Sequence, residues 1–461
     1  MNTLNQRIPG SFRDPSGFVF KKNGSIYRQV NPIYREDYDH LMYSGLYDAL
    51  IKNRLLIPHE EIDPTSIGIE GAYKILKPEH IPFISYPYEW CFSQLKEAAL
   101  TTIRIQKIAL DFKMSLKDGS AFNIQFKEGK PIFMDTLSFE RFPEGKPWIA
   151  YRQFCQHFIA PLALMADKDV RINQWLKIYL DGIPLDLAGL LLSWRTFFKF
   201  SWLTHIHMHA RGLKYLSQRS VKKKDHPVSH QGFLGILDSL ESSIKKTKWN
   251  PSGTEWGDYY DQTNFTSAGF QHKQETVGDF LDRIKPDMVW DLGANTGLFS
   301  RLSARKGVFT VSFDIDPAAV EKNFLQCREE RESHILPLIL DVTNPSPAIG
   351  WENQERMSLL ERGPVDTVLA LSLIHHLAIS NNLPLDRIAG FFAKICKRLI
   401  VEFIPKEDSY AQRLLSSRRD IFPEYQQSHF EYEFKKNFEI RDLVKIRDSK
   451  RTLYLMFNKG L

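Results

Sequence analysis

The chain has 461 residues, about three times the commonest domain length, so two domains, or two with a connector, are expected. Hydrophobic residues make up 43% and charged residues 25%, which excludes a disordered, collagen-like or low-complexity chain. The formal net charge is +6, but residues 216–250 hold seven Lys/Arg against three acids, so the rest is close to neutral and no nucleic-acid partner is expected.

Cysteine usage and hydropathy predict a cytoplasmic protein. The four cysteines are scattered, with no Cys-x-x-Cys and no His/Cys spacing that would hold zinc, and this fits reduced thiols in a cytosol. The first residues contain no apolar run of the kind found in signal peptides. The most apolar window, residues 183–203, contains Asp186, Arg195 and Lys199, so we expect a buried helix pair there and no membrane span.

Residues 1–215 predict a mixed α/β domain. Asn23-Gly24 separates two β-rich runs and is a strong signal for a hairpin. Apolar residues then recur at helical spacing over residues 37–56 and 89–112, and helices are expected to dominate from about residue 148. From residue 216 the composition turns to Ser, Lys, His and Gly, which predicts a basic linker with a helix over residues 216–250.

Residues 251–461 alternate apolar strands, glycine turns and amphipathic helices, the pattern of a parallel α/β sheet. Residues 288–297 combine a strand, Asp291 and a Gly-x-x-x-Gly turn formed by Gly293 and Gly297. Glycines let the backbone approach a ligand closely. Because the acid would repel a pyrophosphate, the turn suits a ligand with a cationic amino-acid end.

Three further strands also end in polar side chains. The second strand, residues 308–313, precedes Asp314, whose carboxylate can accept both hydroxyls of a ribose. The third precedes Asp341, and the fourth runs into His375 and His376. Because open α/β sheets bind ligands at the carboxyl ends of their strands, we expect these groups to serve one ligand.

These segments resemble the class I S-adenosylmethionine-dependent methyltransferases, over about residues 250–461. The resemblance implies an α/β fold, a seven-stranded Rossmann-like sheet with helices on both faces and a final antiparallel pair, here preceded by a mixed α+β domain. It implies S-adenosylmethionine as the cofactor, with Asp314 at its ribose and Asp341 with Val342 at its adenine. The acid of the first loop is often Glu in this superfamily, and Asn295 stands where a middle glycine is usual. The loop that would hold the methionine part contains Asp291, Gly293, Asn295 and Gly297.

Methyl transfer from a sulfonium is an in-line displacement, so the protein chiefly has to align the nucleophile with the methyl group. If the acceptor is a hydroxyl or an amine, a general base contributes further, and His375 or His376 is the candidate, with only one of these neighbours expected to face the ligand. The alternative is that an imidazole packs under the following helix and hydrogen-bonds a main-chain carbonyl. Glu402, at the end of the next strand, is a base, a substrate anchor or a structural pairing partner.

Two other clusters have both a functional and a structural interpretation. Trp256, Tyr259 and Tyr260 precede the first strand of the predicted sheet, and they either contact the cofactor or pack in the core. His205 and His209 share a helix face and could bind a metal with a third ligand. Because no acid stands nearby in the right place, an interface or core role is expected and no metal site.

A polar motif in the first half resembles the catalytic loop of protein kinases. Asp118 and Asn123 are five residues apart and Asp135 follows twelve residues later, close to the spacing of the catalytic Asp and the two metal-binding residues in such enzymes. There is no clear Gly-rich loop, no His-Arg before Asp118, and Thr-Leu replaces Phe-Gly after Asp135. Residues 1–215 are therefore either kinase-like or a domain that recognises the acceptor.

The complete sequence predicts a two-domain methyltransferase whose N-terminal domain presents or selects the acceptor. The chain is also similar to bacterial two-part methyltransferases catalogued among nodulation and surface-glycan genes, which suggests a small metabolite or a glycan as the acceptor. The alternatives are a bifunctional enzyme with an ATP-dependent phosphotransferase half, and a cofactor-binding protein without catalysis. The acceptor atom and the oligomeric state stay open.

Overall fold

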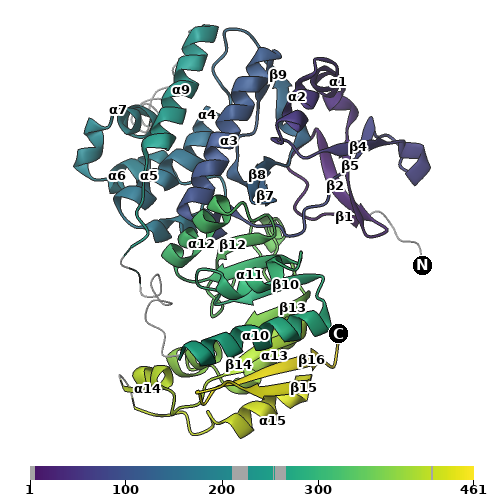
Figure 1. The fold of residues 1–461 in the computed structure, drawn as a ribbon. Helices are drawn as coiled ribbons and strands as arrows, with labels where there is room; N and C mark the ends of the chain where they lie inside the picture. Colours follow the sequence, from purple (N-terminus) through teal and green to yellow (C-terminus); the bar gives the residue numbers. More distant parts are fainter. Residues whose placement is uncertain (1–5, 210–226, 253, 255–265, 417–418) are drawn as a thin grey trace. The chain divides into compact units, whose positions relative to one another are not determined.

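The computed structural model describes residues 6–209, 227–252, 254, 266–416 and 419–461, and the chain forms two compact units (Figure 1). Unit 1 comprises residues 1–250 together with 349–356, and unit 2 comprises residues 251–348 and 357–461. In the described part of the chain, every helix is too short or too polar to traverse a lipid bilayer.

Unit 1 begins with an antiparallel sheet of five strands in the order β1-β2-β3-β5-β4. The strands are β1 (Gln6–Arg7), β2 (Gly17–Lys22), β3 (Ser25–Val30), β4 (His59–Ile62) and β5 (Lys74–Pro78), and helices α1 (Arg35–Tyr43) and α2 (Leu46–Lys52) fall between β3 and β4 in sequence. The predicted hairpin joins β2 to β3. Asn23 and Gly24 adopt φ angles of 49° and 80°, which match the turn that a tight hairpin needs.

The rest of unit 1 is mainly helical. The long helix α3 (Phe92–Asp111) buries residues at three- and four-residue spacing, as expected for one apolar face. Two short antiparallel pairs follow, β6 (Met114–Leu116) with β9 (Phe139–Arg141), and β7 (Ile124–Lys127) with β8 (Lys130–Phe133). The later helices are α4 (Tyr151–Phe154), α5 (Ala160–Asp167), α6 (Leu185–Leu191), α7 (Phe200–Trp202) and α9 (His230–Lys246), with 3-10 or π-helical turns at Cys155–Ile159, Val170–Lys177, Trp194–Phe198 and Leu203–Met208.

Helix α9 falls within residues 216–250, the stretch expected to be a basic linker. It packs on α3, and Lys107 of α3 pairs with Asp238 of α9 at 2.6 Å. Residues 210–226, which include Lys222, Lys223 and Lys224, lie outside the described residues. The described part of this stretch therefore belongs to unit 1.

Unit 2 is built on one sheet of seven strands in the order β12-β11-β10-β13-β14-β16-β15. The strands are β10 (Met288–Leu292), β11 (Phe309–Asp314), β12 (Ile335–Ile339), β13 (Val365–Ala370), β14 (Cys396–Phe403), β15 (Phe438–Lys445) and β16 (Thr452–Asn458). Strands β10 to β14 pair in parallel, and β16 is antiparallel to both β14 and β15. The predicted α/β sheet with a final antiparallel pair is confirmed.

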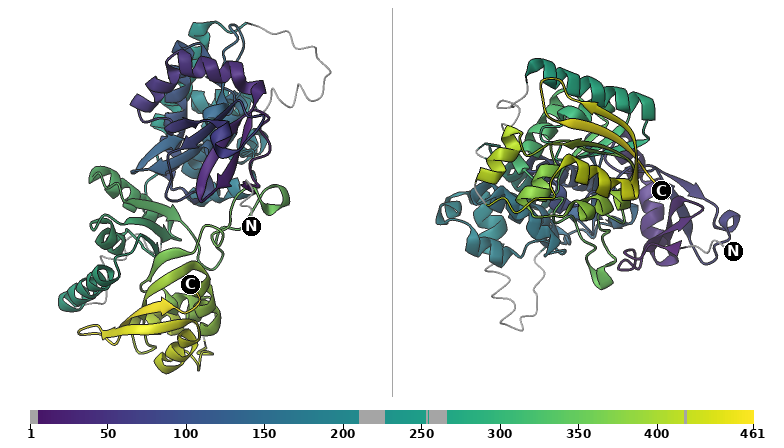
Figure 2. Two further views of the ribbon diagram at one scale, coloured as in Figure 1. Left: turned by 90° about the vertical axis from the view of Figure 1, so that its right-hand side faces the viewer. Right: turned by 90° about the horizontal axis from the view of Figure 1, so that it is seen from below.

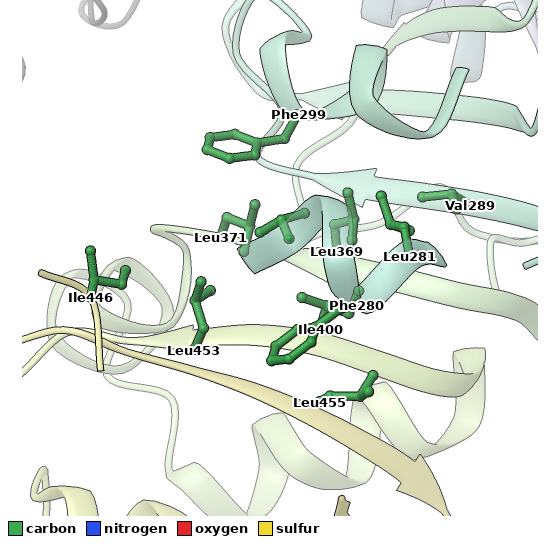
Figure 3. Packing of buried hydrophobic residues seen from close by; sticks show 11 residues of the cluster. Phe280, Leu281, Val289, Phe299, Leu369, Leu371, Ile400, Ile446, Leu453 and Leu455 are labelled. Atoms are coloured by element: carbon green, nitrogen blue, oxygen red, sulfur yellow. The ribbon is translucent and has the colours of Figure 1, made fainter. Parts of the chain in front are cut away.

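Helices cover both faces of this sheet (Figure 2). They are α10 (Ser267–Ile284), α11 (Leu298–Ala304), α12 (Pro317–Glu329), α13 (Leu385–Ile395), α14 (Ser409–Ser416) and α15 (Gln427–Asn437). Figure 3 shows the core under α10, where Phe280 and Leu281 pack with Val289, Leu369 and Ile400 of the strands. Full burial of side chains of this size contributes roughly 1.5–3 kcal/mol each, so this core fixes the strands whose ends form the site.

One short segment of the second half belongs to unit 1. Residues 349–356 lie between β12 and β13 in sequence, yet Nε of Arg13 donates to Glu355 at 2.9 Å across 342 residues of chain. The guanidinium of Arg356 lies 4.4 Å from the centre of the Phe122 ring. The segment also bonds to itself, with an isolated bridge between Ile349 and Arg356, but its contacts with Arg13 and Phe122 are remote along the chain, so sequence periodicity gives no sign that it belongs to unit 1.

Candidate functional site

A cavity of about 320 Å³ lies at the carboxyl ends of β10, β11, β12 and β13. Asp291, Asp314 and Asp341, from the ends of three neighbouring parallel strands, line it together. Of the other residues selected from the sequence, the lining includes Gly293, Asn295, Val342 and His376. Gly297, His375 and Glu402 are not among the described residues that line it.

The turn after β10 is shaped by residues with positive φ angles. Gly293, Asn295 and Gly297 adopt φ values of 76°, 52° and 79°. A Cβ on Gly297 would lie 2.5 Å from the side-chain amide of Asn323, so the position requires glycine. Asn tolerates the left-handed conformation better than most residues, which explains how Asn295 can stand where a glycine is usual. The backbone N–H of Asn295 donates to Oδ2 of Asp314 at 2.7 Å and so connects the turn to the end of β11.

Burial raises the pKa of two acids in the cavity. It raises the pKa of Asp291 to about 7, although Oγ of Ser300 donates a hydrogen bond to its carboxylate at 2.7 Å. It raises the pKa of Asp314 to about 6, although the amides of Asp316 and Asn295 donate to that carboxylate. Two poorly solvated carboxylates side by side favour a ligand that brings a positive charge.

A buried ion-pair network borders the cavity. Lys273 of α10 lines the cavity, and its Nζ donates to Glu402 at 2.7 Å. The amide of Ser372, another lining residue, donates to the same Glu402 oxygen at 2.8 Å, and Arg451 lies 3.5 Å from the other oxygen. Burial alone would raise the pKa of Glu402, but Lys273 and Arg451 lower it overall, so this carboxylate stays ionised. Glu402 thus fixes Lys273 and Ser372 at the cavity wall.

The two neighbouring histidines differ in their position. His376 lines the cavity, and burial lowers its pKa to about 4. His375 is buried, and burial lowers its pKa well below the ordinary value. Nδ1 of His375 has no hydrogen-bond partner in the described part of the chain, so the expected bond to a main-chain carbonyl is not made through that atom. Both imidazoles are neutral at neutral pH.

Several cavity residues were not selected from the sequence, namely Phe270, Lys273, Thr343, Ser372, Asn381 and Leu414. A signal for Lys273 exists, because it occupies a core-facing position of α10 between the apolar Phe270 and Val277. A lysine on the apolar stripe of a helix indicates a buried cation with a partner. Phe270 shares that helical stripe, whereas Thr343, Ser372, Asn381 and Leu414 lie in loops or in the short helix α14, where no periodicity distinguishes them.

Two further groups were predicted from the sequence, the aromatic residues before β10 and the histidines of unit 1. Trp256, Tyr259 and Tyr260 lie outside the described residues. The ring nitrogens of His205 lie 2.7 Å from Oη of Tyr151 and 2.9 Å from Oγ of Ser239. Among the described residues there is no group of three or more His, Cys, Asp or Glu side chains arranged to hold a metal ion.

The structure places the three kinase-like residues of the first half around the β7–β8 hairpin. Burial and the nearby charge of Asp135 raise the pKa of Asp118, against hydrogen bonds from the side chains of Asn123 and Gln153. Asp135 also pairs with Arg28 of β3 at 2.7 Å. Three polar residues that are separate in sequence therefore lie in one cluster with a cation.

A sheet in this strand order, with acids at the ends of successive parallel strands around one cavity, is the class I methyltransferase fold, and unit 2 has this fold. Over 456 residues the chain is 32% identical to the Nodulation protein NoeA of Rhizobium meliloti (strain 1021), a match that covers 97% of this chain and 95% of that protein. The chain therefore belongs to the NoeA family, and the similarity to proteins catalogued among nodulation genes is confirmed. No family model matches the chain.

Solved structures resemble unit 2 at low sequence identity. Magnesium protoporphyrin IX methyltransferase from Synechocystis PCC 6803, solved with bound SAH, is 18% identical with a TM-score of 0.31, covering 44% of this chain and 92% of that one. PH0226 protein from Pyrococcus horikoshii OT3 is 18% identical with a TM-score of 0.33, covering 45% and 100%. The bifunctional kinase-methyltransferase WbdD is 18% identical with a TM-score of 0.30, covering 44% and 42%.

Proposed function

We propose that unit 2 binds S-adenosylmethionine in this cavity and transfers its methyl group to an acceptor. The proposal rests on the convergence of Asp291, Asp314 and Asp341 from three neighbouring strands on one cavity. A cofactor with an ammonium group, a ribose diol and an adenine uses three such carboxylates in that order. Asp291 takes the ammonium group, Asp314 the ribose hydroxyls, and Asp341 with Val342 the adenine.

Lys273 completes the methionine end of the proposed site. The cofactor's amino-acid end carries a carboxylate beside its ammonium group. Lys273 lines the cavity, and although burial lowers its pKa, the nearby charges of Glu402 and Asp291 favour its protonated form. Glu402 holds the ammonium group of Lys273 at 2.7 Å and so fixes its position. We assign Glu402 this positioning role in place of a role as base.

His376 is the base that the cavity offers to an acceptor. The transfer itself is an in-line displacement, for which alignment supplies most of the acceleration. A hydroxyl or an amine must also lose a proton. Burial lowers the pKa of His376 to about 4, so its imidazole is unprotonated at neutral pH but is a weak base until a charged ligand or acceptor raises that pKa. A small metabolite or a glycan is the acceptor class that we favour.

Transfer of labelled methyl groups tests this function. Purified protein and tritiated S-adenosylmethionine are incubated with fractionated metabolites and with surface glycans from bacteria that carry a related chain. Label is expected in one fraction with the native protein and not with Asp314→Ala. Asp386→Ala, the same substitution at an exposed position of unit 2, serves as the control and should retain transfer. Cofactor binding with no transfer to any fraction would favour the non-catalytic alternative.

A second candidate is phosphotransfer by unit 1, favoured by the cluster of Asp118, Asn123 and Asp135. An Asp to orient the acceptor and an Asn with an Asp to hold magnesium are what that chemistry needs. The ion pair between Arg28 and Asp135 weighs against it, because it occupies a carboxylate that magnesium would use. Magnesium-dependent ATP binding that Asp135→Ala abolishes would support phosphotransfer, and ATP binding unchanged in that variant would exclude this site.

A further inference from the structure

Unit 1 exposes a group of large apolar side chains that its core does not use. Leu190, Trp194, Phe198 and Phe200 are 80%, 68%, 80% and 75% exposed, and we call them the aromatic ridge. They lie on α6, on the 3-10 helix Trp194–Phe198 and on α7. Each of these three elements contacts the π-helical turn Leu203–Met208. Trp194 and Phe198 are in edge contact, with ring centres 5.8 Å apart. Trp194 and Phe198 therefore form one aromatic pair, and Leu190 and Phe200 are exposed on elements that adjoin it.

The ridge falls in a stretch of chain without an acid, although Asp186, four residues before Leu190 on α6, is exposed. Residues 187–224 contain Arg195, Lys199, Arg211, Lys214, Arg219, Lys222, Lys223 and Lys224, and no Asp or Glu. Of these cations, Arg195 and Lys199 are described and exposed beside the ridge. Nζ of Lys199 lies 3.8 Å from the centre of the Trp202 ring, so the charge of this exposed lysine rests on an aromatic face in a cation-π contact.

The chemistry of the ridge identifies its partner. Exposed Trp, Phe and Leu between Lys and Arg are the composition of surfaces that rest in the interface of a bilayer with anionic lipids. A symmetric contact with a second copy would bring Arg195 and Lys199 near their own copies, with Asp186 as the exposed acid of α6, so like-charge repulsion opposes it. Bases of a single-stranded nucleic acid can also stack on exposed aromatic rings beside cations, but Leu190 adds aliphatic surface that stacking does not use.

We propose that the aromatic ridge is a peripheral membrane-binding surface, specific for bilayers with anionic head groups. Leu190, Trp194, Phe198 and Phe200 enter the boundary between head groups and acyl chains, and Arg195 and Lys199 contact the lipid phosphates. The proposal is independent of methyl transfer. It places unit 1 at a membrane surface.

Sedimentation of the full chain with vesicles tests the proposal. Vesicles of phosphatidylcholine alone are compared with vesicles of equal parts phosphatidylcholine and phosphatidylglycerol. The native chain is expected to bind the anionic vesicles, and Trp194→Ser/Phe198→Ser/Phe200→Ser should weaken that binding by about tenfold or more. Arg195→Gln/Lys199→Gln should bind less to the anionic vesicles, with a weaker dependence on salt.

A matched control distinguishes binding through the aromatic ridge from non-specific adsorption of apolar side chains to vesicles. Ile33 and Tyr43 are 77% and 89% exposed elsewhere in unit 1, so Ile33→Ser/Tyr43→Ser removes comparable apolar surface and should bind vesicles as the native chain does. The ridge side chains are exposed, and unchanged thermal melting will show that the variants fold. Equal vesicle binding by native and ridge-variant chains overturns the proposal. So does a native dimer in light scattering that the ridge variant loses while vesicle binding is absent.

Discussion

The carboxyl group of Asp291 is held in an environment that opposes its charge. Burial raises its pKa from an ordinary value of 3.8 to about 7, and a hydrogen bond from Ser300 offsets only part of that effect. The folded protein therefore keeps a proton on Asp291 that the unfolded chain releases. Stability from this group is fully present below about pH 4 and is lost as the pH rises toward 7.

The first prediction concerns the pH dependence of unfolding. Asp291→Asn keeps an acceptor for Ser300 and removes the titration, so it should raise the melting temperature of the ligand-free protein at pH 8, by roughly 3 °C or more. At pH 5, which lies between the unfolded and folded pKa values, the variant should exceed the native chain by a clearly smaller margin than at pH 8. Thermal melts at the two pH values check this, and an equal shift at both would show that burial of the charge is not the cause.

A second prediction concerns the amino-acid end of the cofactor. Lys273→Met keeps the aliphatic stem and removes the charge, so it should weaken binding of S-adenosylhomocysteine by about tenfold. Binding of methylthioadenosine, which lacks the amino and carboxyl groups, should change little. Because the variant also frees Glu402, its melting temperature must be recorded in parallel. An equal loss for both ligands would assign Lys273 a structural role only.

A single site residue can be predicted from the sequence where the residues that flank it form a recognisable pattern. Asp291, Asp314 and Asp341 are visible because each follows an apolar strand. Lys273 is marked only by its position on an apolar helix face. The difference between His375 and His376 is invisible, because adjacent residues diverge only once the local backbone is known.

The turn between β10 and α11 shows how one element depends on a single residue type. Gly297 combines a φ of 79° with a position where a Cβ would lie 2.5 Å from the side chain of Asn323. Gly307, after α11, has the same φ of 79° but open space around it. Alanine at Gly307 would therefore test backbone strain alone, whereas alanine at Gly297 would add a steric clash.

The third prediction uses this pair. Gly307→Ala carries the strain of a positive φ alone and should lower the free energy of unfolding by about 1 kcal/mol. Gly297→Ala adds the clash, so it should lower that free energy by roughly 1–3 kcal/mol more. Denaturant unfolding of both variants measures the difference. Equal losses would mean that Asn323 moves aside and that the fit to Gly297 is not required.

Helices and strands can be predicted where the pattern of apolar residues in the sequence matches the burial of those residues in the fold. The parallel strands of unit 2 are apolar runs with polar ends, and both faces of the sheet are covered, so their sequence matches their burial. The β2–β3 hairpin follows from Asn23-Gly24. The membership of residues 349–356 in unit 1 escapes prediction, because Arg13 and Phe122, which they contact there, lie far away in the sequence.

The whole molecule is not a simple succession of two domains. Residues 349–356 are flanked in the sequence by residues of unit 2 but belong to unit 1. There Glu355 pairs with Arg13, and Arg356 lies over the ring of Phe122. The second half thus donates a segment to the first. Unit 1 without this segment would expose the surface around Phe122.

The fourth prediction follows from this exchange. Replacing residues 350–356 in the full chain by Gly and Ser of equal length should lower the melting temperature of unit 1 by roughly 2–4 °C, from loss of contacts worth about 1 kcal/mol in total. Affinity for S-adenosylhomocysteine should stay unchanged, because the cavity lies in unit 2. Scanning calorimetry and titration check both parts. An unchanged melting profile would mean that the segment contributes nothing to unit 1.

The central claim is that the cavity at the carboxyl ends of β10 to β13 is a site for S-adenosylmethionine. Calorimetric titration of the intact chain with S-adenosylhomocysteine at pH 8 tests it most directly. We predict saturable binding that Asp314→Ala weakens by about tenfold or more, the effect of a lost hydrogen bond to a charged group, and that Asp386→Ala leaves unchanged. No binding by the folded native chain, or equal affinity in the folded Asp314→Ala variant, would contradict the account.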